Sequence, residues 1–488
     1  MKKVSFLITF CIVLFSYAQN RQDYHLSWDG TSSILKVKLL YTPTNKDSTV
    51  FVYGDPTFGG QIDIFKVVKN IHCNPSENLK ISENDRKITV YHHDSKTKTL
   101  TYEIDGSKPD DKKSTIYTEL FRPVITNGFL STPNSFFMLD KKSETNDLIS
   151  IVWDHYPHQF IYFNSMNPTA AANKNLSIKE KEMGRYLFVM GNKISVKKYN
   201  VMGIPYYSIY SNEKEYSILK TKLPPYFTDY FPSIRKFWND TDEAFYYVAV
   251  LPLKYAGKTK AGGYGMDDGF LMKYLGDYGY WEKHVIAHET SHHWIGLKLI
   301  IGKNSFDNQW FGEGFNDYVT LINLAKSKID SKEEFINYLN KENLELHYKS
   351  PVKDSSNASI AKNYWTDYPN YGKLPYRRGL IYAFYLDNQI RLASKGKFTL
   401  RNLLIDLKNL EHTKKESIGI SLEEFINLGS KYIPKEQFEN EIKTYMIAGK
   451  PIDFKTVKLI PEFHLYFEKD IPQIKFTPNA SIDKIYNW

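Results

Sequence analysis

The first half of the chain carries short runs in which apolar and polar positions alternate. Between residues 19 and 212 the apolar positions are rich in β-branched and aromatic residues, the pattern of a strand with one buried face. Turn residues such as Gly59-Gly60 and Gly191-Asn192 separate the runs. The pattern predicts an antiparallel sandwich or saddle. The expected strands are Ile34–Tyr41, Thr49–Tyr53, Lys87–Tyr91, Leu100–Ile104, Leu148–Trp153, Phe160–Phe163 and Tyr186–Met190.

From Lys214 onward the apolar positions recur every three or four residues, which is typical of amphipathic helices. One strand-like run, Ala244–Leu253, interrupts them and leads into the glycine-rich segment Gly262–Gly265. The last stretch, Pro451–Trp488, is strand-like again. The expected helices are Tyr216–Trp238, Tyr280–Leu299, Phe311–Ala325, Lys332–His347, Arg377–Ser394, Leu400–Leu410, Leu422–Tyr432 and Glu436–Ala448.

The change of period near Lys214 predicts a multidomain α+β protein. A chain of 488 residues is too long for one compact core, which agrees with more than one domain. We expect a signal peptide over residues 1–18, a β-rich domain over 19–213, a mixed and helical catalytic domain over 214–450 with a helical C-terminal part, and a short β-like tail over 451–488.

The N-terminus has the three parts of a secretory signal. Lys2 and Lys3 form a positive region, Val4–Phe15 is an apolar run, and Ser16–Ala18 supplies small residues for cleavage before Gln19. No later stretch is long and apolar enough to span a membrane. We therefore expect export to the periplasm or the exterior of a bacterial cell.

The charge pattern and the cysteine content argue against a nucleic-acid-binding protein and against a disulfide-stabilised one. The formal net charge is +9, but the lysines and arginines are interleaved with acids, which indicates a solvated surface and not a nucleic-acid partner. Cys73 is the lone cysteine once the signal segment with Cys11 is removed, so no internal disulfide is expected. We interpret Cys73 as a small buried hydrophobe, since no activating neighbourhood surrounds it.

The segment from His284 to Trp294 contains the pattern HExxH. On a helix, His288 and His292 lie one turn apart on the same face, so both imidazoles can reach one metal ion. Glu289 lies beside them, placed to take a proton from water at that ion. The apolar flanking residues indicate a helix buried in the centre of a domain.

A second segment, Trp310–Tyr318, completes the pattern. A catalytic zinc site needs three protein ligands, and two histidines with one glutamate are a known set. Glu313 supplies the third ligand from the next predicted helix, and Asp317 follows one turn later on the same face. Asp317 can therefore accept the free ring N–H of a ligating histidine, which fixes the ring's orientation. The residues predict a site for one zinc ion.

Together these segments resemble the gluzincins, zinc peptidases in which a downstream glutamate completes the metal site. The sequence WFGEGFNDYV around Glu313 is similar to the WFSEGFTDYY of the glycyl-aminopeptidase-like branch, and the alanyl and leucyl aminopeptidases are related. The segment Leu374–Gly379 and the long helix after it resemble the same branch. The resemblance covers Ala244 to Leu410 and implies a thermolysin-like catalytic domain, with an aminopeptidase activity on peptide or protein substrates.

The resemblance also implies roles for residues outside the metal set. Tyr376, which precedes Arg377-Arg378-Gly379, corresponds to the tyrosine that stabilises the oxyanion, and Tyr371 is a second candidate. The glycine-rich segment stands where these enzymes bind an extended substrate beside the backbone. The residues expected to bind substrate there are Gly262, Gly263, Asp267 and Asp268, the two aspartates through the α-amino group.

The sequence departs from the family pattern in ways that concern specificity. Twenty residues separate His292 from Glu313, two more than usual, and the GxMEN segment of the large aminopeptidases is missing. An endopeptidase of the same clan is therefore an alternative. An inactive peptide-binding module is a second one, although every expected catalytic residue is present. An adhesin built on the β-rich domain is a third.

Other histidines and arginines are less specific indicators of function. His293 points about 100° around the helix from His292, so we interpret it as a packing residue. The pair formed by His284 and His288 lacks a glutamate at the required offset, which counts against it as a metal pair. Arg377 and Arg378 are candidates for binding a substrate carboxylate, although surface roles are more common for arginine.

Overall fold

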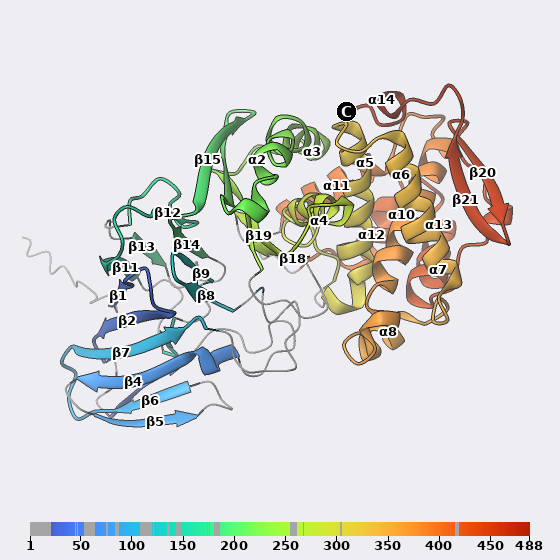
Figure 1. The fold of residues 1–488 in the computed structure, drawn as a ribbon. Coiled ribbons are helices and arrows are strands. Elements are labelled where there is room, and N and C mark those ends of the chain that lie inside the picture. Colours follow the sequence, from blue (N-terminus) through green and yellow to red (C-terminus); the bar gives the residue numbers. More distant parts are fainter. Residues whose placement is uncertain are drawn as a thin grey trace, which may run out of the picture.

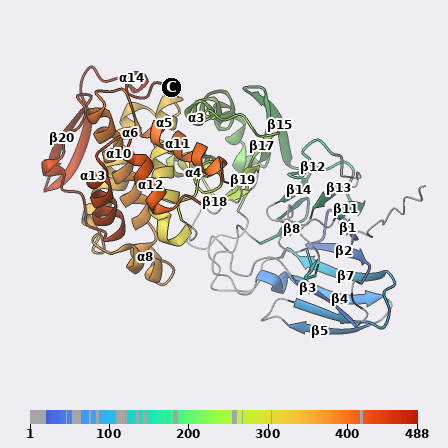
Figure 2. The ribbon, with the colours of Figure 1, turned by 180° about the vertical axis from the view of Figure 1, so that it is seen from behind.

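The computed structural model describes most of the chain after the expected signal segment. The described residues are 21–43, 45, 47–52, 64–74, 77–82, 87–107, 120, 122–133, 137–142, 148–172, 174, 176–179, 186–253, 261–266, 268–302, 305–414 and 419–488. The expected signal peptide, residues 1–18, and the candidate residue Asp267 lie outside them. Figure 1 shows β-rich sheets at one end of the molecule and a helical mass at the other, and Figure 2 shows the same division from behind.

Three sheets form the β-rich end. The largest has the order β13-β11-β1-β2-β7-β4 and is antiparallel except for the parallel pair β1 and β11. Its strands are β1 (Arg21–Ser27), β2 (Ile34–Tyr41), β4 (Val68–Asn74), β7 (Lys98–Asp105), β11 (Leu148–His155) and β13 (Leu176–Lys179). In β2 the buried residues alternate with more exposed ones, as the sequence pattern predicts.

Two four-stranded sheets complete this end. The sheet β10-β3-β6-β5 consists of β3 (Ser48–Val52), β5 (Asn78–Ser82), β6 (Lys87–Tyr91) and β10 (Leu139–Asp140). The sheet β12-β14-β9-β8 consists of β8 (Val124–Thr126), β9 (Phe129–Pro133), β12 (Ile161–Asn164) and β14 (Leu187–Gly191). Part-buried Cys73 lies on β4, and burial raises the pKa of its thiol, which agrees with an unreactive side chain.

A five-stranded sheet lies between the β-rich end and the helices (Figure 1). Its order is β15-β16-β17-β19-β18, so β18 is an edge strand. The strands are β15 (Ile194–Val201), β16 (Ile204–Ser211), β17 (Tyr246–Pro252), β18 (Ala261–Met266) and β19 (Gly269–Tyr274). The glycine-rich segment is thus a strand. The expected boundary at residue 213 stays a prediction, and the strand β16, which precedes it, pairs with β17, which follows it.

Helices pack against this sheet and fill the other end of the molecule. They are α2 (Leu219–Lys222), η6 (Tyr226–Tyr230), α3 (Phe231–Trp238), α4 (Tyr280–Ser291), η8 (Trp310–Phe315), α5 (Asn316–Lys326), α6 (Lys332–Asn337), η9 (Tyr338–Glu345), α7 (Leu346–Lys349), α8 (Asn357–Asn363), α9 (Tyr368–Tyr371), α10 (Leu374–Ala393), α11 (Leu400–His412), α12 (Leu422–Gly429), α13 (Lys435–Glu441) and η10 (Ile442–Ile447). Among the described residues, none of the helices combines the length and the apolar character that a membrane span requires.

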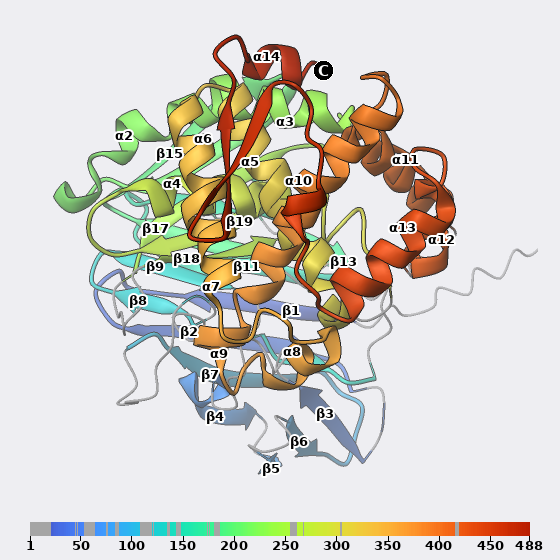
Figure 3. The same ribbon diagram turned by 90° about the vertical axis from the view of Figure 1, so that its right-hand side faces the viewer.

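The C-terminal tail forms a hairpin of β20 (Phe463–Glu468) and β21 (Ile471–Phe476), followed by α14 (Ile482–Ile485). Figure 3 shows the hairpin on the side of the helices that faces away from the β-rich sheets. The final residue, Trp488, donates a hydrogen bond from Nε1 to the Ser233 carbonyl, so the tail is packed into the helical part.

Two predicted helices differ in extent. The expected helix Tyr216–Trp238 is interrupted at Leu223, just before Pro224-Pro225, because proline lacks the N–H that a helix interior uses and fits the first turn of a new helix. The expected helix Tyr280–Leu299 ends at Ser291, with His292 as its C-cap, and Gly296 then adopts a φ of +108°. The fold class is nevertheless confirmed: β-rich sheets precede a mixed and helical part.

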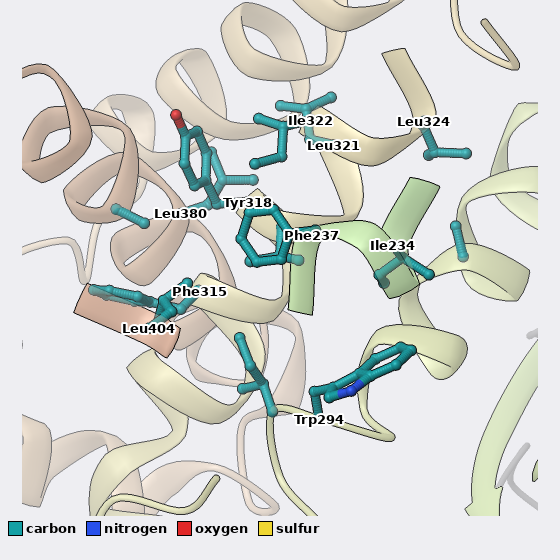
Figure 4. Close-up of a cluster of buried hydrophobic side chains, with 14 of the residues drawn as sticks. Ile234, Phe237, Trp294, Phe315, Tyr318, Leu321, Ile322, Leu324, Leu380 and Leu404 are labelled. Carbon is teal, nitrogen blue, oxygen red and sulfur yellow. The ribbon is translucent and has the colours of Figure 1, made fainter. Parts of the chain in front are cut away.

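Apolar side chains from the two ligand-bearing segments, from α3 and from α11 belong to one buried cluster. Figure 4 draws Trp294, which follows the HExxH segment, and Phe315, which follows Glu313, among the side chains of one buried cluster. Ile234 and Phe237 of α3 and Leu404 of α11 belong to the same buried cluster. The two ligand-bearing segments therefore rest on one hydrophobic core, which holds them at a fixed separation.

A second apolar cluster joins the β-rich end to the five-stranded sheet. Phe163 and Val189 come from the sheet that contains β12 and β14, while Ile209, Ala249 and Leu271 come from β16, β17 and β19. All five side chains are almost fully buried. The two parts are thus connected by a packed hydrophobic interface.

Candidate metal centre and active-site cleft

Helix α4 presents the candidate residues of the HExxH segment. The helix begins after Gly279, whose N–H donates to the Glu282 carboxylate at 2.8 Å. Ile286 and Ala287 are fully buried and face the core. His288 and Glu289 lie in the last full turn, and the His292 N–H still bonds to the His288 carbonyl at 3.2 Å. Both candidate histidines therefore share one helical turn.

Glu313 comes from η8, a π-helical turn that continues into α5. Two glycines allow η8 to cross α10 at close range. A Cβ atom added to Gly314 would lie 2.4 Å from the Gly379 Cα, and one added to Gly379 would lie 1.8 Å from the Trp310 carbonyl oxygen. Only glycine fits at this crossing, and the close approach of the two helices sets the position of Glu313, which adjoins Gly314.

Three potential ligand atoms converge. The Nε2 atoms of His288 and His292 are 2.9 Å apart, and Glu313 Oε2 lies 3.3 Å and 3.4 Å from them. In a tetrahedral zinc site with bonds of about 2.0–2.1 Å, the ligand atoms lie about 3.3 Å apart. The predicted set of His288, His292 and Glu313 is thus brought together at spacings close to those of a zinc site.

The remaining ring nitrogens fix the tautomers. Nδ1 of His288 lies 2.6 Å from Asp317 Oδ1, and Nδ1 of His292 lies 3.0 Å from the Ile295 carbonyl oxygen. Both partners are acceptors, so both Nδ1 atoms donate a proton and, in neutral rings, both Nε2 atoms carry lone pairs.

In the part of the chain that the structure describes, the three ligand atoms lack a positively charged partner. Two Nε2 lone pairs and a carboxylate oxygen face one another, and Glu313 Oε2 is buried with no hydrogen-bond donor among the described residues. Burial lowers the pKa of His288, but the Asp317 and Glu313 carboxylates outweigh it and raise that pKa to about 10. The site therefore attracts positive charge, and its ligand types fit zinc.

A further histidine, His284, supports this arrangement. Its Nε2 lies 3.2 Å from Asp317 Oδ1, and its ring stacks on Tyr338 at 4.2 Å between centroids. The Tyr338 hydroxyl approaches the other Asp317 oxygen at 3.4 Å. His284, His288 and Asp317 also form a compact group, but these distances are those of N–H donors to a carboxylate. Asp317 is thus oriented by three side chains.

The candidate ligands lie in a cleft of about 730 Å³. Glu289 lines it, and Gly262 and Gly263 of the edge strand β18 form the facing wall. A Cβ atom on Gly263 would lie 2.3 Å from Glu289 Cγ, so glycine makes room for this carboxylate. Burial raises the pKa of Glu289 against the opposing effect of the two imidazoles. A raised carboxyl pKa suits a general base.

The two candidate tyrosines occupy different environments. Tyr376, in the first turn of α10, lines the cleft, and its ring stacks on His288 with the centroids 5.9 Å apart. Tyr371 packs against a small apolar cluster that contains Ile360 and Leu374. Of the two, Tyr376 is the one whose ring faces the candidate metal ligands.

Other predicted residues lie outside the cleft. Asp268 follows β18 but does not line the cleft, and its carbonyl accepts the Tyr247 N–H at 2.9 Å. His293 is buried against Glu243, which agrees with a packing role. Arg378 is buried and donates to backbone carbonyls, including that of Ser355 at 2.7 Å, so it is not oriented toward substrate.

Sequence reasoning missed two residues at the mouth of the cleft. Trp281 precedes His288 by seven residues, and Lys373 precedes Tyr376 by three. Both line the cleft, as does Arg377. Helical spacing could have placed Trp281 near the His288 face, because seven residues complete two turns. Nothing in the sequence links Lys373 to Trp281.

Comparison with known proteins identifies the fold. No protein-family model and no curated protein matches the chain. An aminopeptidase N family protein from Idiomarina loihiensis has a similar structure, with a TM-score of 0.70 and 16% identity over 88% of this chain and 76% of that one.

An M1 zinc metallopeptidase from Deinococcus radiodurans, solved as a mutant bound to a Tyr-Ser-Ala substrate, has a TM-score of 0.52 and 13% identity over 88% of this chain and 94% of its own. A further structure of that metallopeptidase has a TM-score of 0.50 at 13% identity, with the same coverage. The chain thus has the fold of the M1 zinc metallopeptidases, and the predicted gluzincin-like architecture is confirmed.

Proposed function

We propose that the chain is a zinc-dependent peptidase, and specifically an aminopeptidase. The observation that carries the proposal is the convergence of the His288 and His292 Nε2 lone pairs on the buried Glu313 oxygen, inside a cleft that Glu289 also lines. One zinc ion would be held by these three ligands.

The chain's own groups divide the proposed reaction between them. A bound zinc ion would supply the positive charge that polarises a peptide carbonyl and acidifies water. Glu289 takes the proton from the attacking water and passes it to the leaving amine. The Tyr376 hydroxyl donates a hydrogen bond to the oxyanion that develops on the carbonyl oxygen. Asp317 holds His288 in the tautomer that leaves Nε2 free.

Substrate binding is proposed along β18. As an edge strand, β18 offers backbone N–H and C=O groups to an extended peptide, and Gly262 and Gly263 let that peptide approach closely. Recognition of the substrate's α-amino group by Asp267 or Asp268 stays a proposal as well. The aminopeptidase assignment draws support from the name of the similar Idiomarina loihiensis protein and from the Tyr-Ser-Ala substrate of the Deinococcus radiodurans enzyme.

Cellular location is part of the same proposal. The n-region, apolar run and small residues before Gln19 support export from a bacterial cytoplasm, with the enzyme acting in the periplasm or outside the cell.

The test combines metal analysis with a substrate panel. The purified chain is expected to bind one zinc per molecule and to hydrolyse aminoacyl amides with a free α-amino group, with activity lost on chelation and restored by zinc. Glu289→Gln should keep the zinc and lower kcat by at least 100-fold, because the base is removed and the ligands remain.

Three outcomes would change the assignment. Cleavage of N-blocked peptides would make the protein an endopeptidase. Stoichiometric zinc without turnover of any substrate would favour a peptide-binding module. A chain that binds no zinc would contradict the proposal.

A further inference from the structure

Lys373 places a cation at the mouth of the cleft. It is the residue just before α10, and it lines the cleft together with Glu289 and Tyr376. Its Nζ lies 4.0 Å from the centroid of the Tyr376 ring and 5.2 Å from that of Trp281. Both aromatic faces attract an ammonium group, so the lysine is held in place between the two rings.

This lysine differs from the other lysines near the candidate site. Lys283 on α4 is paired with Asp330 and Glu334, and Lys298 is paired with Asp240. Within the described part of the chain, Lys373 Nζ has no carboxylate oxygen within 4.0 Å. Its charge is therefore not used by a structural ion pair there.

The nearby carboxylates have other partners. Glu313 and Asp317 face the imidazoles of the candidate metal site. Glu342 also lines the cleft, where its charge acts on Arg377, and the Arg377 Nε donates to the Glu342 backbone carbonyl at 3.2 Å. Of the lysine and arginine side chains that line the described cleft, Arg377 is held by this bond to the backbone, whereas Lys373 has no carboxylate oxygen within 4.0 Å of its Nζ and can meet a ligand.

Lys373 also lies close to the reaction centre. Its ring partner Tyr376 stacks on His288 with the ring centroids 5.9 Å apart, and Glu289 lines the same cleft. A peptide whose carbonyl reaches Glu289 would pass Lys373 within a residue or two. A carboxylate at that point would form a charge-assisted hydrogen bond with the ammonium.

We propose that Lys373 is a specificity-determining residue that binds a carboxylate of the substrate. The preferred substrates are peptides with a negative charge within one or two residues of the scissile bond. That charge is either the C-terminal carboxylate of a very short peptide or the side chain of Asp or Glu. This inference rests on the proposed peptidase function.

A different role for Lys373 predicts different kinetics. If the ammonium acted only through the Tyr376 ring, its loss would lower kcat for all substrates equally. If it binds a carboxylate, its loss raises KM for the charged substrates and leaves the neutral ones much less affected.

The experiment compares four dipeptides on the zinc-loaded full chain. Ala-Ala with a free carboxylate is compared with its C-terminal amide, and Ala-Glu amide with Ala-Gln amide. In the wild type at least one charged member should be preferred in kcat/KM by about 10- to 100-fold, as expected for a hydrogen bond to a charged group. The pair that shows the preference identifies the source of the carboxylate.

Variants then assign the preference to Lys373. In Lys373→Met the ratio of kcat/KM between the charged and the neutral dipeptide should fall to about 1, because KM for the charged dipeptide rises. Lys373→Arg should restore most of the preference. Lys236→Met is the matched control, because Lys236 is an exposed lysine on α3 away from the cleft, and it should leave the ratio unchanged. Equal kcat/KM values within both pairs in the wild type would overturn the proposal, and so would an equal loss of kcat on all four substrates in Lys373→Met.

A binding measurement separates this inference from the proposed function. Calorimetry on Glu289→Gln with the same four dipeptides is expected to show the same preference, which is lost when Lys373→Met is added. If none of the dipeptides is hydrolysed by the wild type, the aminopeptidase proposal fails for these substrates, while the calorimetry still decides whether Lys373 selects a carboxylate. No preference in binding would overturn the role of Lys373.

Discussion

Replacement of Gly379 by alanine tests whether the helix crossing holds the metal site together. The added Cβ atom would lie 1.8 Å from the Trp310 carbonyl oxygen, and real Cβ atoms essentially never come within 3.0 Å of such an atom. Helix α10 and η8 must therefore separate by about 1.2 Å or distort locally. Metal–ligand distances tolerate about 0.2 Å, so a movement of this size at η8 is enough to disturb Glu313.

The expected result for Gly379→Ala has two parts. Overpacking at the crossing should lower the free energy of unfolding by about 1–3 kcal/mol, although alanine's better helix propensity offsets up to about 1 kcal/mol. Loss of the hydrogen-bond partner of a metal ligand lowers metal affinity by about 10- to 100-fold. Loss of the ligand itself costs at least as much, so zinc affinity should fall by about 100-fold or more.

Zinc affinity is measured by competition with a chromophoric chelator, and stability by denaturant unfolding of the zinc-free protein. Gly312→Ala is the matched control: it lies in the same turn next to Glu313, and its Cβ would have no atom within 4 Å. It should bind zinc like the wild type and be slightly more stable. Wild-type zinc affinity and stability in Gly379→Ala would refute the idea that this crossing positions Glu313.

Two further substitutions test the orientation of the catalytic groups. Asp317→Asn should weaken zinc binding by about 10- to 100-fold, because His288 loses a charged acceptor, and chelator competition giving an affinity within twofold of the wild type would contradict this. Gly263→Ala should lower kcat at least about 10-fold with zinc retained, since Glu289 must turn away from β18 to avoid the new Cβ. Gly265→Ala, whose Cβ would meet nothing within 4 Å, should keep normal kcat.

The metal set could be predicted from the sequence because it depends on local geometry. His288 and His292 are one helical turn apart, and so are Glu313 and Asp317, so a single periodicity places each pair on one face. Only the meeting of the two helices is non-local, and for the HExxH helix the apolar flanking residues already indicated burial in the centre of a domain.

Features that depend on distant contacts were not predictable. Gly262–Gly265 lacks the β-branched pattern of a strand, and β18 exists because it pairs with β19 over its whole length. The role of His284 needs Asp317 and Tyr338, which come from two other helices. Lys373 and Trp281 are 92 positions apart in the sequence, and only the tertiary fold, in which the start of α10 lies near α4, brings their side chains together.

The apolar cluster between the β-rich end and the five-stranded sheet bears on how substrates enter. Relative motion of two domains is expected where their interface is small and polar, whereas this interface is built from buried residues such as Phe163, Ile209 and Ala249. A hinge at this junction would expose those side chains to water at each opening. We therefore expect the β18 wall to stay still, so that admission of a peptide depends on the other residues that line the cleft, such as Trp365 and Tyr368.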